Sequence, residues 1–203
     1  MQIVSSRRKL MNYNAQIIIQ KELDSKERLL WAGMPKQGTV FRGSDAFMIP
    51  FSLIWGGFAI FWEYTVLFTM PKGPNAPDGI GLVFPIFGIP FVVIGLYMIF
   101  GRFICDSKKR AKTFYGLTDQ RAIIVSGMVS KNIKSLNLKT MTDVSLSEKS
   151  NGYGTIIFGQ ENQMISMFVG GGFPGMGGSN TPRFELIEDA KQVYNQLREY
   201  QKS

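Results

Sequence analysis

The sequence contains no histidine and a single cysteine, Cys105. The chain therefore lacks the commonest general base and the commonest metal ligand in proteins. One cysteine cannot form an intramolecular disulfide, so a disulfide-stapled scaffold is excluded. Charged residues are scarce, at 19% of 203 residues, whereas hydrophobic residues make up 45%. This composition excludes an intrinsically disordered chain, which would be poor in apolar side chains.

Motifs that carry catalysis are missing as well. The sequence has no G-x-S-x-G nucleophile elbow, no metal-ligand spacing and no clustered carboxylates. Cys105 has no histidine that could activate its thiol as a nucleophile. The glycine-rich segment 170–178 is not followed by the Gly-Lys-Ser/Thr of a phosphate-binding loop. We therefore expect no enzymatic activity, no cofactor and no metal site.

Two long apolar runs dominate the sequence. Residues 46–70 contain one charged side chain, Glu63, and residues 81–101 contain none. A helix needs about 20 apolar residues to cross a hydrocarbon core that is ~30 Å thick. The alternative, a pair of core helices in a soluble domain, would leave a polar side on each helix, and neither run has one. The sequence thus predicts two transmembrane helices, at about 46–68 and 81–104.

The connection and the flanks of the runs predict their topology. Residues 71–80 hold three prolines and two glycines, which is typical of a short turn. Lysine and arginine cluster outside the two runs, whereas the turn holds only Lys72. Because cytoplasmic flanks of membrane helices are rich in basic residues, we expect a hairpin with both chain termini in the cytoplasm.

Small residues in the runs predict how the two helices pack. Ser52 and Gly56 are four residues apart in the first run, and Gly81, Gly88 and Gly95 recur every seven residues in the second. Small side chains let membrane helices approach closely, which predicts a packing seam within the hairpin or between copies. The alternative is that glycine is simply common in membrane helices.

Glu63 has two interpretations. A carboxylate within the hydrocarbon core is costly and marks a functional site. However, Glu63 lies between Trp62 and Tyr64, and these aromatic residue types are enriched at membrane interfaces. If the span ends at Trp62, Glu63 lies among the headgroups, which is the interpretation that we favour.

The flanking segments predict a polar leader and a folded domain. Residues 1–44 form an N-terminal cytoplasmic segment, whose first ten residues lack any pattern of regular structure. Asp24 and Glu27 have capping-box spacing, which predicts a short helix through Leu29 to Trp31. The hairpin occupies residues 45–104, and residues 113–203 form the folded domain.

The folded domain has the pattern of a small β structure closed by a helix. Apolar residues at Ala190, Val193 and Leu197 predict a C-terminal amphipathic helix. Segments rich in β-branched and aromatic residues, separated by turn residues, predict seven strands. These strands are 113–118, 121–127, 132–138, 142–148, 154–160, 164–170 and 183–187.

Three segments resemble a known family. They are DSKERLLWAGMPKQG (24–38), TFYGLTDQRAIIVSG (113–127) and NGYGTIIFG (151–159). Together with the two apolar runs, they resemble bacterial membrane proteins with a pleckstrin-homology-like (PH-like) domain, a mostly uncharacterised family. The resemblance implies an α+β membrane protein of the bacterial inner membrane. Its hairpin would be followed by a PH-like seven-stranded β-barrel or sandwich with a C-terminal helix.

The remaining signals concern lipid contact. Five basic residues follow the second run, and each can gain ~1 kcal/mol near an anionic leaflet. The alternative is that these charges only set topology. Two apolar side chains on the glycine-rich loop are expected to dip into the bilayer, unless that loop has no task. The predicted contacts are Arg102, Lys108, Lys109, Arg110, Lys112, Phe173 and Met176.

These signals predict a binding function rather than chemistry. We expect a membrane-anchored PH-like scaffold that engages a protein partner and anionic lipid at the cytoplasmic face. A homo-oligomer is a further expectation. The basic residues are split between the two flanks, so we expect no nucleic-acid binding. The alternative function is a small two-span subunit of an oligomeric transporter or channel.

Overall fold

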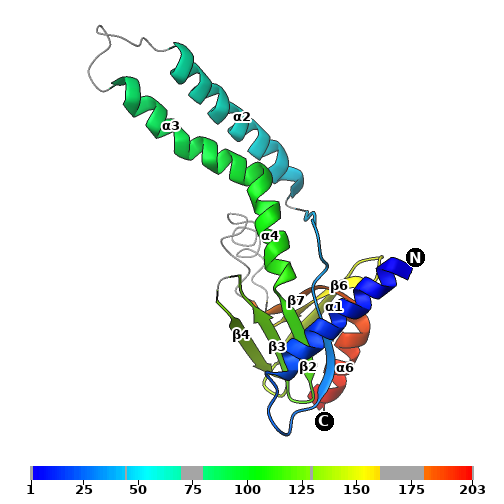
Figure 1. Cartoon of the computed structure of the whole chain (residues 1–203). Helices are drawn as coiled ribbons and strands as arrows, with labels where there is room; N and C mark the ends of the chain where they lie inside the picture. The colour runs from blue at the N-terminus through cyan, green and yellow to red at the C-terminus, as the bar shows by residue number, and fades with distance from the viewer. Residues whose placement is uncertain (1, 44, 70–79, 129, 161–180, 203) are drawn as a thin grey trace. The chain divides into compact units, whose positions relative to one another are not determined.

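The computed structural model describes residues 2–43, 45–69, 80–128, 130–160 and 181–202 (Figure 1). The chain forms two compact units, which we call the hairpin (residues 41–105) and the sheet domain (residues 1–40 and 106–203). The predicted strand 164–170 and the predicted lipid contacts Phe173 and Met176 lie outside the described residues.

Two long apolar helices form the hairpin, as the sequence predicts. Helix α2 spans Asp45–Thr69, and α3 spans Ile80–Leu96. Helix α3 continues without a break through a π-helical turn, η1 (Tyr97–Gly101), into α4 (Arg102–Ala111). Pro50 lies inside α2, and Pro85 and Pro90 lie inside α3. By length and composition, α2 and the continuous helix Val83–Ala111 could each cross a membrane.

The strands of the sheet domain form two antiparallel sheets. The first has the order β1-β2-β3-β4, and the second has the order β5-β6-β7. In the first sheet, β1 is Leu29–Gly33, β2 Phe114–Thr118, β3 Arg121–Ser126 and β4 Asn132–Asn137. In the second, β5 is Val144–Glu148, β6 Tyr153–Phe158 and β7 Arg183–Glu188. Two helices complete the domain, α1 (Gln2–Gln20) and α6 (Ala190–Lys202).

The main core lies among the two sheets and α6. Phe184 of β7 is fully buried and contacts three other aromatic rings, those of Trp31, Tyr115 and Phe158. Helix α6 buries the apolar stripe that the sequence predicts. The same cluster contains Leu117, Ala122, Ile124, Leu138, Ile156, Ile187, Ala190, Val193 and Leu197.

A second core lies between α1 and the first sheet. Ala15 and Ile19 of α1 are fully buried and pack with Ala32 and Val125. Gly116 makes this close approach feasible, because a Cβ at that position would lie 2.4 Å from Cγ2 of Ile19. The expectation that the first ten residues lack structure is therefore wrong, since α1 begins at Gln2.

Residues Leu29 to Trp31 also differ from the prediction of a short helix. They form β1, which pairs with β2 through matches such as Trp31 with Leu117. The backbone of β1 is satisfied by this sheet edge, and the side chain of Trp31 packs on the main core. Tertiary pairing therefore overrides the local helix signal at Asp24 and Glu27.

The structure shows a mixed α+β chain, with six of the predicted strands at or near their expected positions. Among the described residues, the strands form two separate sheets of four and three strands rather than a closed barrel. The finer expectation of a seven-stranded PH-like barrel stays a prediction.

Candidate functional site

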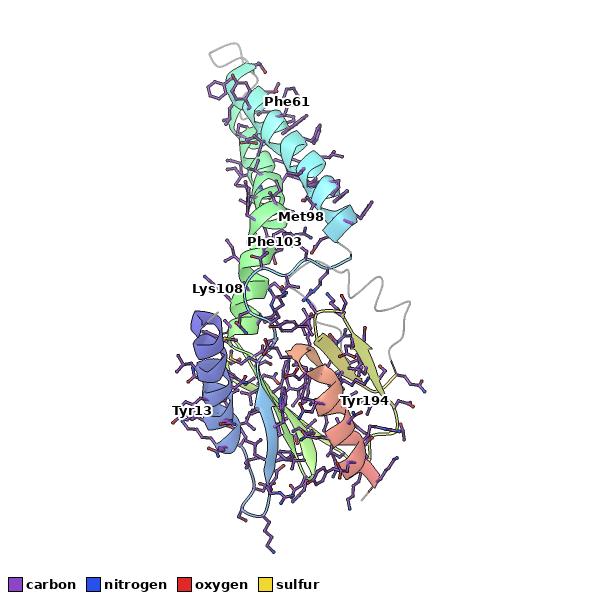
Figure 2. All side chains as sticks on the ribbon, turned by 90° about the vertical axis from the view of Figure 1, so that its right-hand side faces the viewer. Tyr13, Phe61, Met98, Phe103, Lys108 and Tyr194 are labelled. Carbon is purple, nitrogen blue, oxygen red and sulfur yellow. The ribbon has the colours of Figure 1, made fainter. Side chains whose placement is uncertain are left out.

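The outer surface of the hairpin is apolar along both helices. Buried residues make up only 22% of the most apolar stretch of α2, and 17% of that of α3 with its continuation. Phe61 is 66% exposed and points outward from α2 (Figure 2). Core helices of soluble proteins have the opposite arrangement. Other exposed side chains are Phe47, Leu53, Ile54, Phe58, Phe68, Val83, Ile86, Phe87, Ile89 and Val93.

Small residues line the inner seam of the hairpin. A Cβ at Gly95 would lie 2.8 Å from the Cα of Gly56, so the backbones of α2 and α3 nearly touch there. Ser52 is 2% exposed, and its hydroxyl group donates a hydrogen bond to the carbonyl of Ile49. The surroundings of Gly81 lie outside the described residues. Close approach of this kind is typical of packed membrane helices.

Glu63 faces the seam, whereas its neighbours in sequence do not. Its Oε2 lies 1.8 Å from the place that a Cβ on Gly88 would occupy, and this oxygen is buried without a hydrogen-bond partner. Trp62 and Tyr64 are 40% and 60% exposed. Helix α2 continues to Thr69, about 9 Å beyond Glu63. The carboxyl group therefore packs between helices rather than at a helix end.

A buried ion pair closes the other end of the hairpin. Nη1 of Arg102 lies 3.1 Å from Oδ1 of Asp45, and the two side chains are 4% and 12% exposed. The guanidinium group of Arg102 also lies over the ring of Phe103, 4.5 Å from its centroid. Arg102 was predicted as a lipid contact, but this geometry engages it within the chain.

The other four predicted basic contacts divide in a similar way. Arg110 is 4% exposed, pairs with Asp106 and donates to the carbonyl of Gly38. Lys108, which is labelled in Figure 2, is exposed, as are Lys109 and Lys112. Lys112 donates to the carbonyl of Met128 at 3.0 Å. In the predicted run the three lysines are therefore exposed and the two arginines are buried.

A buried carboxylate ties the leader to the turn between β2 and β3. The side chain of Glu27 is 0% exposed and accepts two hydrogen bonds from Arg121, from Nε and Nη2, both at 2.8 Å. Thr118 donates its hydroxyl to the same carboxylate at 2.6 Å, and the backbone N–H of Asp24 donates at 3.0 Å. We call this group the Glu27 clamp.

Burial alone would raise the pKa of Glu27, but the bonds from Arg121, Thr118 and Asp24 outweigh it and lower the pKa to about 2. The carboxylate is thus held ionised at neutral pH. Thr118 and Arg121 are among the residues that carry the PH-like resemblance, and here they support the fold. Sequence reasoning missed the clamp, although a Thr-x-x-Arg turn beside an acidic leader is a usable signal.

Two further surfaces of the sheet domain could serve as contact regions. Strand β4 lies at one edge of the first sheet, and its residues are exposed except for Leu136, which is half-buried. A polar groove of about 510 Å³ runs beside α6. Its lining includes Glu148, Gly152, Asp189, Lys191, Gln192 and Asn195.

The described residues contain no group of three or more histidine, cysteine, aspartate or glutamate side chains placed to hold a metal ion. A scan against protein-family models, a search of curated proteins and a search of solved structures each found no match.

Proposed function

We propose that this chain is a membrane-anchored binding module. The hairpin crosses the inner membrane of a bacterium, and the sheet domain, PH-like in kind, lies in the cytoplasm with both termini. There it binds a protein partner and anionic lipid. The observation that carries the proposal is the apolar outer surface of α2 and α3, because only a bilayer provides an apolar solvent for so many exposed side chains.

Lipid contact is supported by three exposed lysines, two in α4 and one just after it. Lys108, Lys109 and Lys112 come shortly after the apolar run, which ends at Gly101, and we place them near the phosphate headgroups. Each lysine near an anionic leaflet contributes about 1 kcal/mol of attraction.

Protein contact is supported by the exposed edge strand β4. An extended peptide can add to such an edge through backbone hydrogen bonds, with side-chain contacts providing specificity. Ile133 is 45% exposed on this strand and offers an apolar contact beside Lys134. A partner segment with alternating apolar and acidic residues fits this edge.

The test is cysteine labelling of the full chain in a Cys105→Ser background. Single cysteines replace Asn75, in the turn between the apolar runs, or Lys139, an exposed residue of the sheet domain. In intact bacterial cells, a membrane-impermeant maleimide should label the first variant, and it should label the second only after lysis. Recovery of the protein in the soluble fraction, or equal labelling of both variants, would refute the proposal.

A second candidate is a subunit of an oligomeric transporter or channel. The buried, unpartnered oxygen of Glu63 favours it, because a carboxyl group within a membrane seam is a feature of ion pathways. Proteoliposomes of the wild-type chain should then carry an ion flux that Glu63→Gln abolishes and Gly57→Ala leaves unchanged. Absence of any flux would leave the binding module as the only candidate.

A further inference from the structure

Helix α1 has an exposed apolar stripe opposite its buried face. Ala15 and Ile19 pack on the first sheet, whereas Leu10 is 62% exposed, Tyr13 60% and Ile17 37%. These three residues are spaced by three and four positions, so they lie on one side of the helix. Tyr13 points away from the sheets (Figure 2). One helix therefore carries two apolar faces, and only one of them is covered by the described residues.

The stripe continues into an apolar groove of the sheet domain. The groove has a volume of about 350 Å³, and Ile17 belongs to both features. Its walls are mainly apolar side chains from α1, β2, the end of α4 and the segment after β1. They include Met11, Ile18, Met34, Ala111 and Phe114. The exposed apolar surface is thus broader than a single row of side chains.

Charge identifies what covers this surface. The sequence of helix α1 contains Arg7, Arg8 and Lys9 and no acidic residue, so the helix that carries the stripe has a net positive charge. An apolar stripe with cationic residues and no anionic ones is typical of helices that lie in the plane of an anionic membrane surface. A tyrosine with an apolar ring and a polar tip is also suited to the headgroup region.

We propose that α1 is an interfacial helix, which lays Leu10, Tyr13 and Ile17 into the headgroup region of an anionic leaflet. The inference rests on the proposed function, because the hairpin holds the sheet domain near the bilayer. It adds a second contact, so that the domain is held at the leaflet by α1 as well as by the α4 lysines.

The test uses the full chain with Cys105→Ser, reconstituted into vesicles of phosphatidylcholine with one quarter phosphatidylglycerol. A polarity-sensitive fluorophore is attached to Tyr13→Cys or, as the matched control, to Gln16→Cys. Gln16 is exposed on the polar side of the same helix. We expect about a twofold gain in emission at position 13, quenching by lipids labelled near the headgroup, and neither effect at position 16.

Further variants test whether the stripe and the charges are responsible. Leu10→Ser combined with Ile17→Ser should abolish the quenching at position 13, and pure phosphatidylcholine vesicles should weaken it several-fold. Both side chains are exposed, so these changes should leave the thermal unfolding of the sheet domain unchanged.

Three outcomes would overturn the inference. In the first, the chain incorporates into vesicles, but the emission of the probe at position 13 is that of a fluorophore in water. This result refutes the interfacial helix and leaves the hairpin proposal intact. In the second, the probe is shielded without lipid quenching and the shielding rises with protein density, which identifies a second copy as the occupant. In the third, the chain fails to incorporate, which refutes both proposals.

Discussion

The two units of this chain treat large apolar side chains in opposite ways. The sheet domain buries them, whereas the hairpin exposes them. In the sheet domain, Phe184 is 0% exposed at the centre of an aromatic cluster. In the hairpin, Phe61 is 66% exposed, and the seam is lined by small residues such as Gly56 and Gly95. Water drives large apolar side chains inward, whereas lipid gives no such drive and leaves close packing to small residues. The two units therefore differ in the way expected of segments that fold in different solvents.

Buried carboxyl groups differ between the units as well. Glu27 in the sheet domain accepts four hydrogen bonds, whereas Oε2 of Glu63 in the hairpin accepts none from the described residues. A buried polar group that is fully bonded supports a fold, and one that is not is more often functional. This contrast assigns a structural role to Glu27 and leaves Glu63 as the candidate for function.

The strongest test of the comparison replaces one phenylalanine in each unit by alanine. Phe184→Ala should lower the free energy of unfolding of the sheet domain by about 3–5 kcal/mol, because it opens a cavity among Trp31, Tyr115 and Phe158. Phe61→Ala should change the same quantity by less than about 0.5 kcal/mol. Denaturant titration of the full chain in mild detergent measures both, and equal losses would contradict the assignment of separate solvents.

The Glu27 clamp should have the next largest effect. Glu27→Gln keeps the side-chain shape but removes the charge, so we expect a loss of about 2–3 kcal/mol from the free energy of unfolding. Arg121→Met should cost a similar amount, and the double variant should cost much less than the sum. Additive losses would show that the two side chains act independently.

The clamp also predicts how stability depends on pH. Because folding lowers the pKa of Glu27 from 4.5 to about 2, the ionised form stabilises the folded state. This contribution is fully present above pH 4.5 and is lost as the pH falls toward 2. Urea titrations across this range should show the loss in the wild type, and a smaller loss in Glu27→Gln. Identical curves would exclude Glu27 as the group responsible.

A smaller effect is expected at the hairpin seam. Gly95→Val would place a side chain against the Cα of Gly56 and should weaken helix packing by about 1–2 kcal/mol. Gly57→Val is the matched control, because nothing lies within 4 Å of a Cβ at that position. Spin labels on α2 and α3 in lipid nanodiscs would report the separation, and a change in the control alone would contradict the seam.

The smallest effect concerns the exposed lysines. Lys109→Ala should reduce the attraction to an anionic leaflet by about 1 kcal/mol or less. Arg110→Ala should instead destabilise the sheet domain, because Arg110 is buried and bonded to Gly38 and Asp106. Anionic-lipid binding and thermal unfolding of each variant separate the two roles. The reverse pattern would restore Arg110 as a lipid contact.

Local patterns in the sequence predicted the elements that depend on local physics. Uninterrupted apolar runs predicted α2 and α3, and β-branched segments between turn residues predicted six strands. The features that were missed depend on partners far along the chain. Leu29 to Trp31 became a strand only because β2 pairs with it, and Asp45 meets Arg102 only because the hairpin folds back. The residues next to them in the sequence form no pattern that would predict such distant partners.

The adjacency of β1 and β2 has a consequence for biosynthesis. These strands are neighbours in the sheet, yet residues 34–113 separate them in the chain. At roughly 5–20 residues per second, β1 leaves the ribosome about 4–16 s before its partner is made. Strand β1 therefore has no neighbouring strand, and Trp31 has no core to pack on, until the whole hairpin has been synthesised. A chaperone or the membrane surface is the natural shelter for it during that delay.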